Sequence, residues 1–159
     1  MSTGNHRRLP FRKRDSGQAA VEFGLMVVFL MLLLVGFIEP VMLIYSYNVL
    51  ADSAKEGVRY AIVHGIGSTN CSGPGDNTTT PATTCPDAPG ANVQSKVTRY
   101  ALYSLHSTAG MGVNVTYPDT SSRPPSRVRV VVSYQYRPFF GLGWPSVIVR
   151  AAAEGRIMF

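Results

Sequence analysis

The first third of the chain is dominated by one apolar segment. Residues 23–38 form a run of sixteen residues without a charge, and no strong helix breaker occurs between Gln18 and Pro40. Apolar residues fall on every side of the helical wheel, which is typical of a helix surrounded by lipid. At 1.5 Å per residue, residues 18–39 would span roughly 32 Å, about one bilayer core. We therefore predict one transmembrane helix within residues 18–47.

The outer end of this segment carries a different pattern. Glu39 and Pro40 follow the apolar run, and Tyr45 and Tyr47 come shortly after them. Proline removes a helical hydrogen bond, so we expect the helix to leave the membrane here with a kink. Tyrosines are enriched at membrane interfaces, which assigns this pair to the outer aromatic belt.

Helical periodicity continues beyond the predicted membrane boundary. Apolar residues recur at helical spacing within residues 48–62, and charged residues fall mostly elsewhere on the wheel. Two glycines, Gly65 and Gly67, then provide an end signal. The pattern predicts one long helix over residues 18–63, whose outer half presents an apolar stripe: Leu50, Ala54, Val58, Ala61 and Ile62.

The remaining residues predict a small mixed domain. Residues 64–91 read as a loop because glycine, proline, asparagine and threonine predominate. Residues 91–107 favour a second helix, with an apolar face of Val93, Val97, Ala101, Leu102 and Leu105. Alternating patterns predict strands over residues 112–117, 127–136 and 146–159, with one face of the middle strand formed by Val128, Val130, Val132, Tyr134 and Tyr136.

The fold class that follows is α+β. We expect a long, pilin-like N-terminal membrane-spanning helix, followed by a second helix and an antiparallel sheet of about three strands that packs one face against the helices. Residues 48–159 would form the outer domain, and residues 1–17 would precede the span.

Charge is concentrated at the N-terminus. The net charge is +6, but five of the 15 Lys and Arg residues lie within residues 1–14, and residues 18–159 retain 10 basic and 8 acidic residues. Under the positive-inside rule, residues 1–17 form a cytoplasmic leader and residues 48–159 face outward. The alternative is a basic tail without a targeting role. A nearly neutral outer domain argues against nucleic-acid binding.

The two cysteines agree with an outward-facing domain. Cys71 and Cys85 flank a turn-rich segment. In an oxidising compartment such a pair predicts a disulfide, which would stabilise by roughly 3 kcal/mol. Two unpaired thiols in a loop remain the alternative. Two thiols without nearby histidines do not complete a zinc shell, so we expect no metal and no cofactor.

One acid, Glu22, stands just before the uncharged run and five residues after Gly17. If a peptidase cut after Gly17, Gln18 would carry a protonated α-amine, and Glu22 lies at i+4 on the same helical face. Both charges need partners when the helix leaves lipid to pack against other helices. Glu22 could then neutralise its own amine or that of a neighbouring subunit. Two alternatives remain: a helix acid near the headgroups, and a secretory signal cut near Ala51 or Ala54.

The stretches GQAAVEF at residues 17–23, before the apolar span, and SAKEGVRYA at residues 53–61 carry a family resemblance. Together with the valine-rich C-terminal strands, they resemble the TadE-like family of the tight-adherence (Tad/Flp) pilus-assembly system. The resemblance implies a minor pseudopilin of the bacterial inner membrane, single-pass, with its N-terminus in the cytoplasm. It also implies a prepilin peptidase that cuts at Gly17–Gln18, with Glu22 and Phe23 completing the motif. Other pseudopilins and pilus-assembly proteins would be the partners.

Other functions find less support. No nucleophile, base and orienting group stand out, so we expect no enzyme, no secreted hydrolase and no small-molecule substrate. His6, His64 and His106 read as solvated or helix-end residues. The aromatic C-terminal region is either core or an exposed docking patch: Tyr134, Tyr136, Phe139, Phe140 and Trp144. A membrane-anchored adhesin or ligand-binding module is the alternative function.

Overall fold

The computed structural model describes residues 15–75, 84–141 and 143–158. Most of the basic leader, His6 and the middle of the Cys71–Cys85 segment lie outside the described residues. Contacts divide the chain into two compact units, residues 1–38 and residues 39–159. The predicted membrane boundary after residue 47 stays a prediction, because no membrane is present to test it.

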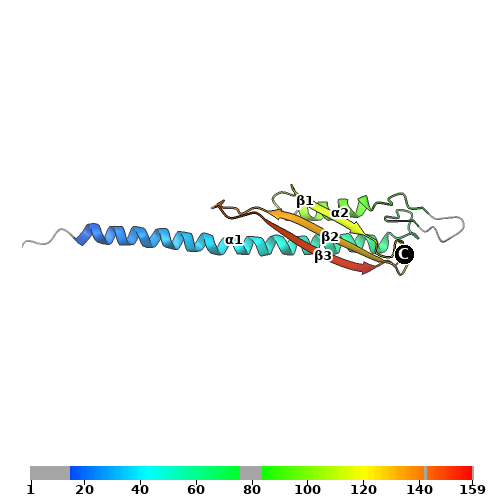
Figure 1. Cartoon of the computed structure of the whole chain (residues 1–159), viewed down its shortest axis with the longest axis horizontal. Coiled ribbons are helices and arrows are strands. Elements are labelled where there is room, and N and C mark those ends of the chain that lie inside the picture. Colours follow the sequence, from blue (N-terminus) through cyan, green and yellow to red (C-terminus); the bar gives the residue numbers. More distant parts are fainter. Residues whose placement is uncertain (1–14, 76–83, 142, 159) are drawn as a thin grey trace, which may run out of the picture. The chain divides into compact units, whose positions relative to one another are not determined.

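Helix α1 (Asp15–Val63) contains 49 residues and retains Pro40 within it. It begins three residues before the predicted start and ends where predicted. The second unit adds α2 (Ala91–Leu102), β1 (Met111–Thr116), β2 (Arg127–Tyr136) and β3 (Val147–Arg156). The predicted α+β class and the three strands are therefore confirmed (Figure 1).

The sheet is antiparallel with the order β1-β2-β3. Val115 pairs with Val130 across the first interface, and Val132 pairs with Ala151 across the second. Because side chains alternate along a strand, this register puts the valines of β2 on one face. Val128, Val130 and Val132 are fully buried there, as predicted.

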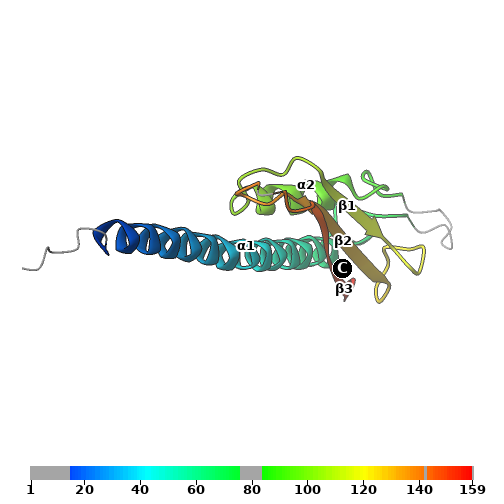
Figure 2. The same cartoon turned by 60° about the vertical axis from the view of Figure 1, so that its left-hand side comes forward.

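Both helices cover that same face of the sheet. A Cβ atom built on Gly155 of β3 would lie 2.6 Å from Val58 and 2.7 Å from Ile62, so α1 packs directly over this strand. α2 contacts β1 and lies beside it in both views (Figures 1 and 2). The core therefore lies between one helical layer and one sheet, and combines α1, α2, β2 and β3 side chains.

The α1 stripe predicted from the sequence is part of this core. Leu50, Ala54 and Ala61 are fully buried, and Val58 is 5% exposed. Within SAKEGVRYA, the small residues Ser53, Ala54 and Gly57 face inward, and the charged residues are exposed or half-buried. Small side chains allow helices to approach closely, so this segment acts as a packing surface for α2 and the sheet.

The second helix is shorter than predicted. It ends at Leu102 rather than Ser107, and a turn follows in which the N–H groups of Ser104 and Leu105 both donate to the carbonyl of Ala101. Leu105 is still buried, but Leu102 is 55% exposed, so its assignment to the apolar face was wrong. The turn carries Leu105 into the core without a further helical turn, which periodicity alone could not distinguish from helix.

Candidate functional site

The predicted processing segment lies in the first turns of α1. Gly17 is exposed, and a Cβ atom built there meets nothing within 4 Å. The Gln18 side chain donates a hydrogen bond from Nε2 to Oε1 of Glu22 at 3.1 Å. Phe23, the next predicted motif residue, is 72% exposed. The structure thus brings residue 18 and the Glu22 carboxylate together on one face, whereas cleavage itself stays a prediction.

The apolar run after Glu22 presents its side chains outward. Most large side chains between Val21 and Ile38 are exposed, from 37% at Val27 to 72% at Phe23. Within the described residues, α1 is the one helix that is long and apolar enough to cross a membrane. Exposing this much apolar surface to water is unfavourable, so lipid is the environment that this surface suits.

Glu39 is a buried, hydrogen-bonded residue, and the sequence did not predict this. Its side chain is 4% exposed, although we assigned Glu39 to an interface exit. Oε2 accepts a hydrogen bond from the Tyr136 hydroxyl at 2.9 Å, and Oε1 accepts one from the Phe140 backbone N–H at 2.8 Å. These bonds fasten α1 to the last residue of β2 and to the segment that follows it. The partners lie about 100 residues away in the chain, so no local signal could have revealed them.

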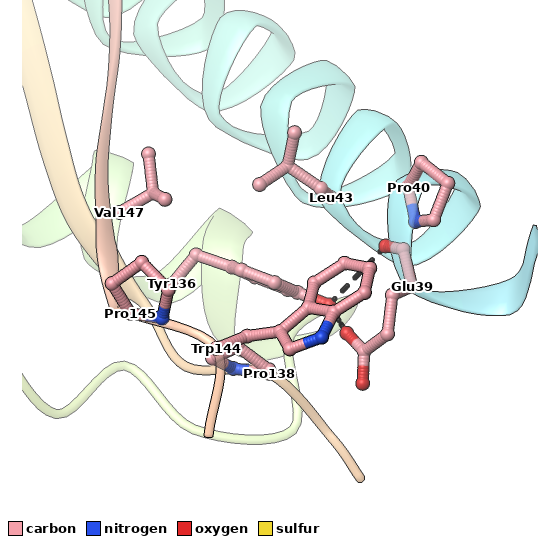
Figure 3. Close-up of a pocket in the computed structure, with 8 residues that line it drawn as sticks. All are labelled: Glu39, Pro40, Leu43, Tyr136, Pro138, Trp144, Pro145 and Val147. Carbon is pink, nitrogen blue, oxygen red and sulfur yellow. Dashed lines mark hydrogen bonds between the residues drawn. The ribbon is translucent and has the colours of Figure 1, made fainter. Parts of the chain in front are cut away.

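An apolar pocket of about 200 Å³ adjoins this contact. Pro40 and Leu43 line it from α1, while Tyr136 and Trp144 line it from the opposite side (Figure 3). Burial, followed by the hydrogen bond to Glu39 and its charge, raises the pKa of Tyr136 to about 12. The phenol therefore stays protonated and keeps donating to Glu39 at any physiological pH. The pocket offers almost no polar group besides this occupied pair.

The aromatic C-terminal region divides between core and surface. Tyr136 is 8% exposed and Tyr134 is half-buried, so both contribute to the core. Phe139, Phe140 and Trp144 are exposed by 76%, 41% and 50%. Part of the region is therefore core and part is exposed surface, while a docking role for the exposed residues stays a prediction.

The Cys71–Cys85 segment is anchored at its base. The two cysteines form a disulfide with a Cα–Cα distance of 5.1 Å, and both sulfur atoms lie close to the Ser122 hydroxyl. The Tyr117 hydroxyl donates to the carbonyl of Ser72 at 2.9 Å, and burial raises the Tyr117 pKa to about 12. Composition predicted a plain loop here, but its ends are fixed by Tyr117 and Ser122, which lie in the segment between β1 and β2.

Asp87 caps α2 from outside the helix. The N-cap residue is Gly90, which has no side chain to donate or accept. Instead, the Asp87 carboxylate accepts the backbone N–H groups of Ala91 at 2.7 Å and Asn92 at 2.8 Å, and the Ser72 hydroxyl at 2.6 Å. Burial alone would raise the Asp87 pKa, but these hydrogen bonds outweigh it and lower the pKa below 3.8.

Changing Asp87 to Ala is expected to lower the free energy of unfolding of the outer domain by about 1–2 kcal/mol at pH 7, since a helix cap is lost. Because the pKa of Asp87 is depressed in the folded state, the ionised carboxylate stabilises the folded domain above about pH 3.8. This contribution disappears as pH falls through the pKa of Asp87 in the folded state. Denaturant titrations of both proteins from pH 7 to pH 3 provide the measurement. If the difference in free energy of unfolding between the two proteins stayed constant over this pH range, the capping role of the Asp87 carboxylate would be contradicted.

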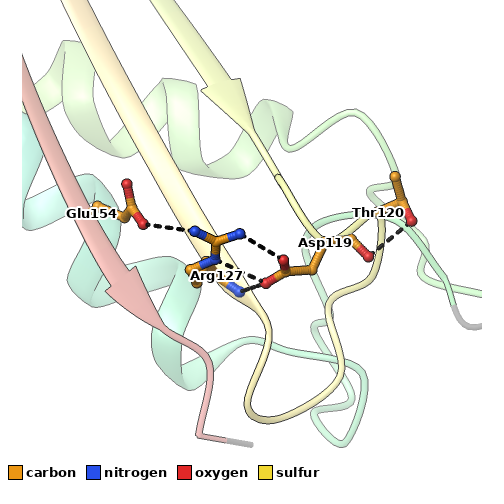
Figure 4. Close-up of polar contacts among 4 residues, drawn as sticks. All are labelled: Asp119, Thr120, Arg127 and Glu154. Carbon is orange, nitrogen blue, oxygen red and sulfur yellow. Dashed lines mark hydrogen bonds and ion pairs between the residues drawn. The ribbon is translucent and has the colours of Figure 1, made fainter.

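A second polar cluster lies at the far end of the sheet. The Arg127 guanidinium donates to both carboxylate oxygens of Asp119, at 2.9 Å and 3.2 Å, and its Nη1 lies 3.8 Å from Glu154 (Figure 4). The hydrogen bonds from Arg127 lower the pKa of Asp119. All three side chains are exposed, so this cluster aligns the β1–β2 connection with β3 and offers no enclosed site.

The described part of the chain shows no candidate metal centre. Its residues contain no group of three His, Cys, Asp or Glu side chains that could hold a metal ion. His64 Nδ1 donates to the carbonyl of Tyr60 at 2.8 Å, and its ring stacks on Tyr60. That geometry confirms the helix-end role expected for His64, and His106 is exposed as expected for a solvated residue.

Comparison with known proteins supports the resemblance seen in the sequence. Residues 17–59 match the family described as TadE-like protein, which is about a quarter of the chain. The match begins at the predicted cleavage site and ends within the part of α1 that packs against α2. Neither the curated proteins nor the solved structures contain a significant match to this chain.

Proposed function

We propose, starting from the match of residues 17–59 to the TadE-like family, that the protein is a minor pseudopilin that acts in assembly of a Tad/Flp pilus. Under this proposal a prepilin peptidase cuts the chain between Gly17 and Gln18. The N-terminus lies in the cytoplasm, α1 spans the bacterial inner membrane once, and the outer domain is extracytoplasmic. The protein is a substrate of an enzyme rather than an enzyme.

The observation that carries the proposal is the contact between Gln18 and Glu22, 3.1 Å between side-chain atoms, at the start of an exposed apolar run. After cleavage, the new α-amine would stand at the positive end of the helix macrodipole, which is unfavourable for a cation. A carboxylate one turn away compensates for it. When α1 leaves lipid to pack against other helices, an amine without this partner would be a buried, uncompensated charge.

The uncut chain has features that suit a peptidase substrate. The Gly17–Gln18 bond lies in the first turn of α1, where helices fray at little cost. Glycine is among the least favourable residues in a helix, so Gly17 weakens this turn further. Cleavage requires only that this short segment unwinds, while the apolar run keeps its internal hydrogen bonds.

The test combines N-terminal sequencing with two substitutions. We expect Gln18 to be the first residue of the protein purified from membranes, and Gly17→Leu to leave the chain uncut. Glu22→Ala should insert normally, but assembly should fall more than tenfold, since removing one partner of a buried ion pair costs about 3–5 kcal/mol. Glu56→Ala, which removes a half-buried acid paired with Arg59 outside the apolar run of the same helix, is the control and should assemble normally.

Two results would count against the proposal. One is a mature protein that starts at Met1 or Ser2, or near Ala54. The other is normal pilus formation by the Glu22→Ala protein. Replacing residues 24–38 by an unrelated membrane span then distinguishes this proposal from the adhesin alternative. A simple anchor should tolerate this exchange, and an assembly helix should not.

A further inference from the structure

The exposed aromatic residues after β2 are held at a defined position on α1. Glu39 accepts two hydrogen bonds there, one from the hydroxyl of Tyr136 at the end of β2 and one from the N–H of Phe140 in the segment that follows. The Glu39 side chain is 4% exposed, so these bonds are shielded from water and retain their strength. Phe139, Phe140 and Trp144, hereafter the aromatic triad, therefore stay close to residue 39 of α1.

The position of Glu39 in the sequence indicates how deep it lies relative to the bilayer. Glu39 directly follows Ile38, the end of the uncharged run that begins at Phe23. A helix needs about 20 residues to cross the hydrocarbon core, so a span that starts at Phe23 ends near Met42. Val41 and Met42 are exposed by 62% and 40%, and they extend the apolar surface of α1 past Glu39. Glu39 and its partners thus belong to the outer boundary of the bilayer.

The side chains gathered there have the chemistry of a membrane interface. Exposed Phe and Trp rings are costly in water but favourable at the boundary between headgroups and acyl chains, where tryptophan is enriched. Val147 at the start of β3 is 46% exposed and lines the same apolar pocket as Trp144. Arg137, which precedes the triad and is exposed, supplies a guanidinium suited to lipid phosphate.

We propose that the aromatic triad inserts into the outer headgroup–acyl boundary of the lipid bilayer and holds the outer domain against the membrane surface. The hydrogen bonds that Tyr136 and Phe140 donate satisfy both oxygens of a carboxylate that would otherwise be costly at this depth. The outer domain then has a second lipid contact besides the span. This inference requires the membrane span but is independent of the role in pilus assembly.

Trp144 provides a direct test, because it is the chain's single tryptophan. The full-length protein is reconstituted into phosphatidylcholine vesicles with and without brominated acyl chains, and insertion is verified by flotation. We expect blue-shifted Trp144 emission, at least about twofold quenching by brominated lipid and weak quenching by aqueous iodide, as for a ring at the interface. Phe139→Ser should reduce the quenching by bromine while leaving the circular dichroism spectrum unchanged, because Phe139 is 76% exposed.

The control places the tryptophan at the C-terminal end of α1, far from Glu39. A Trp144→Phe protein that carries Val63→Trp has its probe 24 residues after Glu39, roughly 36 Å along a helix, and should show no quenching by brominated lipid. Three results would overturn the proposal. Trp144 could be quenched by iodide but not by bromine. Its emission could be blue-shifted without bromine quenching and vary with protein density, which would indicate a neighbouring subunit. Finally, a chain that does not float with vesicles would refute both the span and the proposal.

Discussion

Replacing Gly57 by leucine is expected to lower the free energy of unfolding of the outer domain by about 3 kcal/mol or more, at the upper end of the range for overpacked cores. Gly57 lies on α1 where α2 crosses it. A Cβ atom built there would overlap the Val97 side chain and lie 3.5 Å from both Val93 and Val130. These valines are fully buried and have no space into which to move. Leucine must therefore separate the two helices or distort the sheet beneath them.

Gly24→Leu is the matched control for this substitution. It makes the same change in the same helix, but a Cβ atom at Gly24 meets nothing within 4 Å. We expect no loss of stability there, since leucine favours helix over glycine by several tenths of a kcal/mol or more. Denaturant unfolding of the full chain in detergent micelles, followed by near-ultraviolet circular dichroism, measures both variants. Equal effects of the two changes would contradict the packing role assigned to Gly57.

Removal of the disulfide is expected to cost about 3 kcal/mol. The bond between Cys71 and Cys85 closes a loop with a sequence separation of 14, and the chain-entropy estimate for a loop of about this size gives that value. Serine at both positions preserves the size of the side chains, and the Ser122 hydroxyl is near enough to accept or donate to either one. The comparison therefore isolates the covalent link rather than a packing defect.

Denaturant titrations of the double Cys71→Ser, Cys85→Ser protein and of the unchanged protein provide the measurement. Treating the unchanged protein with a reductant is the control, and it should fall to nearly the stability of the double variant. If reduction left the midpoint of unfolding where it was, the link would not contribute to stability. The double variant is expected to remain membrane-inserted, because both cysteines lie outside the apolar run.

The match to the TadE-like family covers two physical environments within one helix. The first part of the matching segment, through Ile38, has exposed apolar side chains that suit lipid. Its last part, around Ser53, Ala54 and Gly57, has small inward-facing side chains that allow α2 to approach. The same helix therefore needs bulky apolar residues where it meets acyl chains and small ones where it meets protein.

Most of the fold followed from periodicity. The uncharged run, the helical stripe from Leu50 to Ala61 and the alternation of RVRVVVSYQY each extend over enough residues to define an element, and each one appears in the structure. The disulfide also followed from composition and spacing. Element ends were less accurate, as the shortened α2 shows, because a turn and a helix can bury the same leucine.

Among the candidate sites, some could be predicted from the local sequence and others depend on tertiary contacts. Gln18 and Glu22 are four residues apart in a helix, so the sequence by itself determined that they share a face. Glu39, Asp87 and the aromatic triad were decided by tertiary structure, since their partners come from distant segments or from a turn whose path composition does not specify. Sequence patterns report the local period of burial, which depends on backbone geometry. They do not report which distant donor satisfies a buried carboxylate, because that depends on how the chain closes in three dimensions.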